Sequence, residues 1–268
     1  MVAVLVFASL FFLTPIVLMM LNSFKTSAEL AGNSWGLPKE WTLENYISLV
    51  DFNSGLMVRT FFNSVYVSVS YTVLTLLVSS LAAYVFSKLK FRGSNIVFVI
   101  FLATMMIPRE ITMPAIYLMF SRVGLLNTYS IQILPGIANV FCLFMLRQYM
   151  EEIPNSILEA AIIDGANRMQ LFWKIVAPLA KPAIGAMAVL VFLEKWNDYL
   201  WPSVLLTKRD VMPIMVILPM LNVGNSIYAI PWNLIMTGCA IVTLPLVVVF
   251  LIFQEQFMSS VTIGAVKE

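Results

Sequence analysis

Six apolar stretches alternate with polar segments along this chain. They are residues 2–21, 64–86, 96–120 with an interruption at 108–110, 131–146, 182–201 and 234–253. A helix needs roughly 20 apolar residues to cross the hydrocarbon core of a bilayer, and most of these stretches approach that length. Because they are continuously apolar and do not alternate with polar residues, the pattern favours membrane-spanning helices over a membrane β-barrel.

Composition supports this interpretation. Hydrophobic residues make up 60% of the chain and charged residues 11%, with a mean hydropathy of +0.91, whereas soluble domains carry about 25% charged residues. A soluble domain of 268 residues could not bury so many apolar side chains. The sequence therefore predicts an all-α integral membrane protein with six transmembrane helices, organised as a single transmembrane domain over residues 1–268.

The first stretch is interpreted as a retained helix. It has the length of a full span, and it lacks both the basic leader and the small-residue cleavage site of a signal peptide. Because the chain begins abruptly within it, we expect a short tail before Met1.

Prolines and glycines predict where other stretches are interrupted. Pro108 is expected to break the third span, whose second half then runs along the membrane interface. Pro135 and Gly136 are expected to open the fourth span. The apolar residues 211–221 contain two prolines, and they are expected to lie on the membrane surface rather than to cross it.

Charge and residue content exclude several function classes. The net charge of +2 gives no indication of a nucleic-acid partner, and the absence of histidine removes most catalytic triads and zinc sites. Cys142 and Cys239 lie within apolar runs, and they are interpreted as small core residues rather than a disulfide pair. Charged residues are missing from the centres of spans one to four and six, which argues against ion-coupled transport.

One loop predicts the sidedness of the chain. Six spans place both termini on the same side of the membrane. Residues 87–94 carry Lys88, Lys90 and Arg92 without an acidic residue, and short cationic loops face the cytoplasm. The 16 lysines and arginines as a whole divide evenly between the two sides, so it is this loop that predicts cytoplasmic termini.

A polar segment, residues 151–182, separates the fourth and fifth stretches. After Pro154, Ser156 and Glu159 have the spacing of a capping box, which predicts the start of a short helix. Gly165 is placed to end this helix in the left-handed conformation. The apolar residues expected on one face of it are Ile157, Leu158, Ala161 and Ile162.

A second short helix is predicted to start near Asn167, with Gln170 at the capping spacing. Pro178 and Pro182 are expected to end it and to redirect the chain into the fifth span. The apolar residues expected on one face of it are Met169, Phe172, Trp173 and Val176. The residues alone leave two interpretations open: an inert linker at the membrane interface, or an exposed helix pair that docks a soluble partner.

Residues 159–166, EAAIIDGA, together with Pro178 and Pro182, resemble the EAA motif of ABC importer permeases. Other stretches are similar to the branch that imports disaccharides, oligosaccharides and glycerol phosphates, including the maltose-type second permease. They occur in order as SFKT at 23–26, TLENY at 42–46, FNS at 62–64, GLLNT at 124–128, WND at 196–198 and GAVK at 264–267. One departure is Asp198, where the family often has Glu.

The resemblance implies a type I ABC importer permease fold in which residues 151–182 form a cytoplasmic coupling loop. By the same resemblance, this loop contacts an ATPase subunit. The residues implied in that contact are Glu159, Ala160, Ala161, Asp164, Gly165 and Ala166.

The resemblance also implies partners and a location. The partners are a second permease subunit, with a heterodimer expected, two cytoplasmic ATPase subunits and an extracytoplasmic sugar-binding protein. ATP and Mg²⁺ would be bound by the ATPases, because this chain has no G-x-x-x-x-G-K-[ST] loop. No cofactor and no enzymatic activity are therefore expected in the chain itself. Its place would be the cell (inner) membrane of a bacterium or archaeon, as a multi-pass protein in contact with lipid.

The charged end of the fifth stretch is the candidate translocation site. One interpretation of Glu194, Lys195 and Asp198 is an internal ion pair at the membrane interface, anchored by neighbouring aromatic residues. The other is that Trp196, Asn197 and Asp198 face the translocation path. Sugars suit such a set, because aromatic rings stack on pyranose C–H faces and amides bond hydroxyl groups.

Met105 and Met106 lie next to the expected break in the third span. They are interpreted either as a soft gate of the pathway or as core packing, since flexible methionine side chains suit both roles.

Two other function classes stand beside an ATP-driven sugar importer. A secondary transporter or channel subunit for a small polar solute would be expected to show intramembrane charges or inverted repeats. A membrane-embedded enzyme would need a convergent polar cluster within the bilayer. Neither feature is evident in the sequence, which favours the importer subunit.

Overall fold

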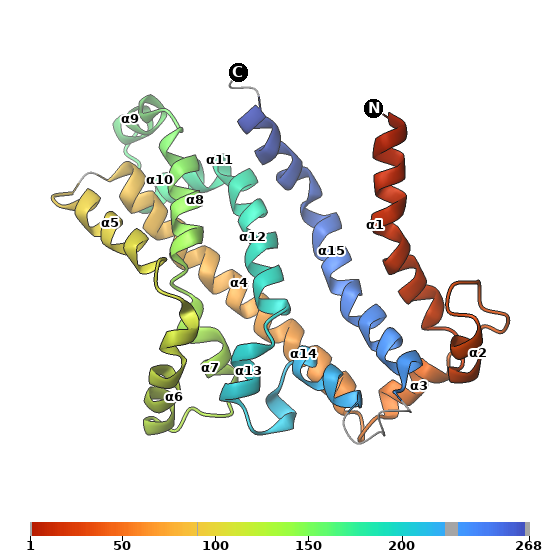
Figure 1. Ribbon diagram of the computed structural model, residues 1–268. Coiled ribbons are helices and arrows are strands. Elements are labelled where there is room, and N and C mark those ends of the chain that lie inside the picture. The colour runs from red at the N-terminus through yellow and green to blue at the C-terminus, as the bar shows by residue number, and fades with distance from the viewer. Residues whose placement is uncertain (1, 90, 223–229, 266–268) are drawn as a thin grey trace. The chain divides into compact units, whose positions relative to one another are not determined.

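Helices make up the regular structure of the chain (Figure 1). The computed structural model describes residues 2–89, 91–222 and 230–265, except for the side chains of residue 3 and residues 256–265. No strand occurs in this described part, which confirms the all-α fold class. Lys90 of the cationic loop and the last two residues of the GAVK match, 266–267, lie outside the described residues.

Three helices are long and apolar enough to cross a membrane without interruption. They are α1 (Val2–Asn22), α4 (Leu56–Lys88) and α15 (Trp232–Ala265). The α4 helix is longer than the predicted span of residues 64–86, because it also includes residues 56–63 before that span and residues 87–88 after it. The apolar part of α1 has none of its residues buried by the rest of the chain. Its apolar surface therefore has to be covered from outside this chain.

Three further candidate spans are bent pairs of helical segments. α5 (Ser94–Thr104) meets η1 (Arg109–Thr112) and α6 (Met113–Arg122) at 89°. α7 (Tyr129–Ile133) and η2 (Leu134–Gly136) meet α8 (Val140–Glu151) at 45°. The segment Arg168–Leu179 meets α12 (Lys181–Trp196) at 77°. With each bent pair taken as one span, the described residues hold six candidate spans by length and composition.

The breaks have local causes. The expected break at Pro108 is confirmed, since α5 ends at Thr104 and η1 begins just after the proline. Pro135 and Gly136 were expected to open the fourth span, but they end its first half, in η2, and α8 begins afresh after Asn139. The Asn139 side chain caps it by accepting a hydrogen bond of 2.9 Å from the N–H of Cys142.

The chain divides into two compact units. Unit 1 comprises residues 1–65 and 206–248 and contains α2 (Ser27–Gly32), α3 (Glu44–Asp51), η4 (Arg209–Val211), α14 (Ile214–Ile217) and η5 (Leu218–Asn222). Its polar core is centred on Asn45, which donates to the carbonyl oxygens of Ser23 and Lys25. The buried Lys25 ammonium in turn donates to the carbonyl oxygens of Asn33 and Gly36.

Residues 211–221 belong to the interior of unit 1, and the expectation that they lie on the membrane surface is wrong. Ile214 and Ile217 are each 1% exposed. Polar side chains of α4 offset the cost of this burial, because they form hydrogen bonds with backbone N–H and C=O groups in and next to this stretch. The Ser64 hydroxyl accepts from the N–H of Ile214 at 2.8 Å, and Asn63 donates to the carbonyl oxygens of Asp210 and Met212.

Unit 2 comprises residues 66–205 and 249–268. Its apolar core joins α4, α8 and α12 to the segment that follows α9 (Asn155–Ile163). Among the core residues are Tyr84, Leu146, Phe172 and Val176, all 4% exposed or less. Cys142 carries a free thiol within this core. Cys239, which belongs to unit 1, is also a free cysteine and is half-buried.

Candidate functional site

Two regions of unit 2 hold the residues singled out in the sequence: the segment 151–182 and a polar cavity. In the first region, α9 begins directly after Pro154, and no side chain caps it. The predicted capping box of Ser156 and Glu159 is therefore wrong, because Ser156 already lies inside the helix. The α4 helix supplies a different anchor: the Lys88 ammonium donates to the carbonyl oxygen of Ile153 and to Asn155 Oδ1.

The end of α9 is as predicted. Gly165 has φ +86°, in the left-handed region. The N–H of Ala166 bonds to the carbonyl oxygen of Ala161 at 2.9 Å, and the N–H of Gly165 bonds to that of Ile162 at 3.0 Å. These two bonds form a Schellman motif, which satisfies carbonyl groups at the helix terminus. The turn between the two short helices is therefore a fixed structure.

The second helix starts as predicted and continues further. Asn167 and Gln170 form the expected capping box, with bonds of 2.9 and 2.8 Å, at the start of α10 (Arg168–Leu171). A π-helical turn, η3 (Phe172–Val176), and α11 (Ala177–Leu179) follow without a break. Pro178 lies inside this continuous segment, so the expectation that it ends the helix is wrong.

The π turn also changes which residues share a face. Its wider geometry sets the residues after it at a different angle from that of an ideal α-helix. Phe172 and Val176 are buried, at 1% and 0% exposure, whereas Met169 and Trp173 are more than half exposed. The four residues were expected on one face, and this is wrong. The sharp turn into α12 comes at Ala180, between the two prolines.

The outer side of α9 is exposed and carries both apolar and acidic side chains. Leu158 is buried against the core, but Ile162 and Ile163 are 56% and 85% exposed. Of the six residues assigned to ATPase contact, four are exposed, namely Glu159, Ala160, Asp164 and Gly165. The other two, Ala161 and Ala166, are half-buried. Within the described part of the chain, Glu159 forms no ion pair. This preformed surface is chemically suited to bind a protein partner.

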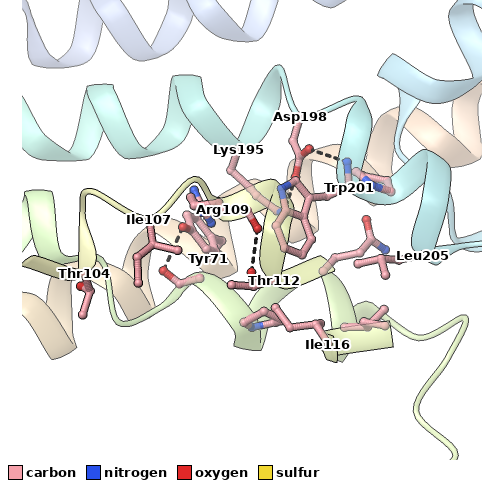
Figure 2. A pocket seen from close by; sticks show the side chains of 15 residues that line it. Tyr71, Thr104, Ile107, Arg109, Thr112, Ile116, Lys195, Asp198, Trp201 and Leu205 are labelled. Carbon is pink, nitrogen blue, oxygen red and sulfur yellow. Dashed lines mark hydrogen bonds and ion pairs between the residues drawn. The ribbon is translucent and has the colours of Figure 1, made fainter. Parts of the chain in front are cut away.

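The second region is a cavity of about 240 Å³ (Figure 2). Its lining mixes polar and aromatic side chains with isoleucine, proline and leucine side chains, and it comes from four segments. The polar and aromatic residues include Tyr71 from α4, Arg109 from η1, Lys195 from α12, Asp198, and Trp201 from α13 (Leu200–Leu205). Figure 2 shows Arg109, Lys195 and Trp201 close together around this cavity.

Helix breaks bring these residues to one place. Arg109 follows the break after α5, Gly136 precedes the break before α8, and Asp198 lies between α12 and α13. The Tyr71 hydroxyl donates to the carbonyl oxygen of Gly136 at 2.9 Å. A side chain on Gly136 would have no room, since a Cβ there would lie 2.6 Å from the Tyr71 hydroxyl oxygen. Polar groups thus satisfy backbone that the breaks expose.

Two ion pairs connect the charged residues of the cavity. Lys195 and Asp198 pair at 2.8 Å, with side chains 10% and 15% exposed. Arg109 pairs with Glu194, and both side chains are about half exposed. The internal ion pair that the sequence left open is thus present between Lys195 and Asp198. Glu194 pairs instead with Arg109 from another span.

Aromatic rings flank both cations. The Arg109 guanidinium lies 6.0 Å from the centroid of the Trp201 ring, and the Lys195 ammonium lies 5.3 Å from that of Tyr71. Asp198 also fixes the next helix, since its Oδ1 accepts from the N–H of Trp201 at 3.3 Å. No site role was predicted for Arg109 or Tyr71. The position of Arg109 directly after a proline break was the one available signal.

Not all residues assigned to the pathway reach a cavity. Asp198 lines the 240 Å³ cavity. Asn197 is exposed and lines, with Asp198, a neighbouring cavity of about 380 Å³. Its side-chain amide donates to the carbonyl oxygen of Leu193. Trp196 is 1% exposed and stacks on Phe192 with a centroid distance of 5.6 Å. The expectation that the Trp196 ring faces a pathway is therefore wrong, because packing covers it. Trp201 is the tryptophan at the cavity.

Met105 and Met106 are 47% and 84% exposed, which rules out core packing within this chain for both. Met105 lines an adjoining cavity of about 420 Å³ together with Arg109 and Glu194. A gating role for the two methionines stays a prediction.

Comparisons with known proteins agree with one another. A family model described as "Binding-protein-dependent transport system inner membrane component" matches residues 75–263. The arabinooligosaccharides transport system permease protein AraQ of Bacillus subtilis is 36% identical over 97% of this chain and 92% of its own length. The diacetylchitobiose uptake system permease protein NgcG of Streptomyces coelicolor is 29% identical over 99% of this chain and 87% of its own length.

A solved structure extends the likeness to three dimensions. It is a bacterial ABC transporter involved in the import of the acidic polysaccharide alginate. One chain of it superimposes with a TM-score of 0.84 at 26% identity, and the match covers 96% of this chain and 94% of that one.

Proposed function

We infer the function from one premise: this chain belongs to the family of binding-protein-dependent transport system inner membrane components. It is a membrane-spanning permease subunit of an ABC importer. We propose that the cargo is a disaccharide or oligosaccharide, as the names of several relatives say of those proteins. The observation that supports the mechanism is the exposed, preformed α9, whose second half and following turn resemble the EAA motif.

In the proposed mechanism, α9 docks on a cytoplasmic ATPase subunit. The exposed isoleucines of α9 supply apolar contact area, and Glu159 supplies a charge for a hydrogen bond or ion pair. ATP and Mg²⁺ are bound by the ATPases, and this chain supplies no catalytic group. Closure of the two ATPases then moves α9 between two positions.

Movement of α9 has a physical route to the cavity within unit 2. Lys88 connects the start of α9 to α4, and the Tyr84 hydroxyl of α4 donates to the carbonyl oxygen of Arg168 at 3.2 Å. The Tyr84 and Phe172 rings pack with centroids 5.5 Å apart. Because the same α4 helix carries Tyr71, a shift at its cytoplasmic end reaches the cavity through a rigid element.

The remaining assignments complete the proposed assembly. A second permease subunit forms the other half of the pathway, and a sugar-binding protein delivers cargo from outside. The cationic loop of residues 87–94 and both termini face the cytoplasm of a bacterium or archaeon. Cysteines introduced for Lys39 and Arg92 test the orientation: in whole cells, a membrane-impermeant thiol reagent is expected to label the first and spare the second. The reverse labelling would overturn it.

The importer function is tested in proteoliposomes that contain this chain, its partner permease, the ATPases and the binding protein. We expect sugar uptake that requires ATP and stops with vanadate. Uptake that ignores vanadate and follows an ion gradient would instead indicate the secondary-transporter alternative.

Docking through α9 is tested with Glu159→Lys and Gly165→Pro, with Glu40→Lys as a control at another exposed acid. The α9 variants are expected to reach the membrane in normal amount, to lose the co-purifying ATPase and to lose uptake. Wild-type ATPase yield together with normal uptake would contradict the assignment of α9.

A further inference from the structure

We propose that the cavity around Arg109, Lys195 and Asp198 binds uncharged sugar in preference to acidic sugar, and that Glu194 and Asp198 set this preference. The inference rests on the proposed sugar import and specifies its substrate class. It treats the two carboxylates as specificity-determining residues and not merely as structural ion-pair partners.

Each cation of the cavity has a carboxylate as its partner: Lys195 has Asp198 at 2.8 Å, and Arg109 has Glu194. Glu110 and Glu194 line a neighbouring cavity of about 380 Å³, which shares Arg109, Lys195 and Asp198 with the first. The charged residues around these two cavities together are thus two cations and three acids, Arg109 and Lys195 against Glu110, Glu194 and Asp198, with a formal sum of −1.

A charged ligand meets both members of each ion pair. A carboxylate on a sugar that approaches Arg109 or Lys195 also approaches the acid already paired with it. Two unit charges 4 Å apart interact by about 4 kcal/mol near a protein surface, so repulsion from the paired acid offsets part of the attraction. An uncharged sugar meets no such opposition.

The cavity still offers an aromatic face and hydrogen-bonding groups to a ligand. The Trp201 ring is only half-buried and presents an aromatic face. The hydroxyls of Tyr71 and Thr112 donate to backbone carbonyl oxygens, so each retains oxygen lone pairs that can accept from a ligand hydroxyl. The Arg109 guanidinium has further N–H groups beyond those used by Glu194. Aromatic surface with uncharged acceptors and donors is the chemistry that recognises neutral sugar hydroxyls and C–H faces.

The same geometry predicts how the preference can be reversed. Asp198→Asn keeps an oxygen that can accept from the N–H of Trp201, but it removes the negative charge and leaves Lys195 without its partner. Glu194→Gln does the same for Arg109. The double variant Lys195→Gln with Asp198→Asn removes both charges of one pair, and it separates the effect of charge from the effect of disturbed packing.

The test uses the purified importer complex without its binding protein, so that selectivity reports on the membrane subunits. Equilibrium binding of radiolabelled maltotriose, arabinotriose and trigalacturonate is measured at low salt. We expect the wild type to favour a neutral trisaccharide over trigalacturonate. Asp198→Asn and Glu194→Gln are each expected to shift the ratio toward trigalacturonate by about tenfold, which corresponds to about 1.4 kcal/mol. High salt should reduce the shift, and the double variant should not show it.

Tight trigalacturonate binding by the wild type would overturn the proposal. So would an unchanged ratio in both single variants, or an equal shift in the double variant. If no sugar binds but the wild type shows vanadate-sensitive sugar uptake, the cavity is not the selecting site and the proposal fails while the importer function stands. If the wild type shows no sugar uptake at all, the importer function fails as well.

Discussion

Lys88, the last residue of α4, donates a hydrogen bond to the carbonyl oxygen of Ile153, two residues before α9 begins. The same ammonium also donates to the carbonyl oxygen of Glu151 at 3.3 Å and to Asn155 Oδ1 at 3.1 Å. The Lys88 charge, from which the cytoplasmic side of its loop was predicted, thus also has a structural role. It ties the end of a long helix to the start of the exposed α9.

Lys88→Met is expected to loosen this link. The variant keeps the length of the side chain but removes the charged donor, and the loss of hydrogen bonds from a charged group costs about 1.5 to 3 kcal/mol. Amide hydrogen exchange over residues 155–163 should become about tenfold faster or more. Arg92→Met is the control, because it removes a charge from the same loop. Equal protection in Lys88→Met and wild type would show that α9 is held by its apolar contacts alone.

Gly165→Ala is expected to destabilise the turn after α9. Gly165 has φ +86° and open space around the position of a Cβ, so the penalty comes from the backbone and amounts to about 1 to 2 kcal/mol. A fall in Tm of about 2–4 °C per kcal/mol is expected. Gly32→Ala is the matched control, since its Cβ also meets open space and its φ is not positive. Equal Tm changes in the two variants would contradict the strain argument.

The buried ion pair of Lys195 and Asp198 gives a third prediction. Lys195→Met leaves the Asp198 carboxylate without its partner at 15% side-chain exposure, and breaking such a pair costs about 3 to 5 kcal/mol. Adding Asp198→Asn should restore a substantial part of the loss, which a thermal unfolding series can measure. The exposed pair of Arg59 and Asp210 is the comparison, with side chains 59% and 64% exposed. Arg59→Met should cost less than about 1 kcal/mol.

Gly136→Ala is expected to damage the cavity. The added Cβ would lie 2.7 Å from a ring carbon of Tyr71, which is 1% exposed and cannot move aside without repacking the core. Overpacking of this kind costs about 1 to 3 kcal/mol. Gly238→Ala meets the flexible end of Leu218 instead and should cost less. In a double-mutant cycle, Gly136→Ala should destabilise the Tyr71→Ala variant much less than it destabilises the wild type. Additive effects would show that the two residues do not interact.

Much of the helical architecture could be predicted because its signals are local. The break at Pro108, the left-handed Gly165 and the capping box of Asn167 and Gln170 each depend on residues a few positions apart. The uninterrupted apolar helices could be predicted from the composition of a single continuous stretch of sequence each. Such features need no knowledge of what packs against them.

The errors arose where tertiary contacts override a local pattern. Ser156 and Glu159 have the spacing of a capping box, but Pro154 and the distant Lys88 set the start of α9 instead. Residues 211–221 resemble an interfacial segment because the sequence does not reveal that Asn63 and Ser64 satisfy their backbone. Arg109 and Glu194 lie 85 positions apart, and no local pattern predicts their pairing. The π turn at 172–176 likewise has no simple sequence signal.

The bent spans have a consequence for biogenesis. The three uninterrupted apolar helices are the first, second and last of the six candidate spans, and the bent pairs lie between α4 and α15. A straight apolar helix can enter the bilayer as it leaves the translocon, because its backbone is already hydrogen-bonded. A bent pair cannot remain facing lipid, since the break exposes N–H and C=O groups that lipid does not satisfy. The central third of the nascent chain is therefore expected to insert with α4 as its template, so that the order of synthesis helps determine the final topology.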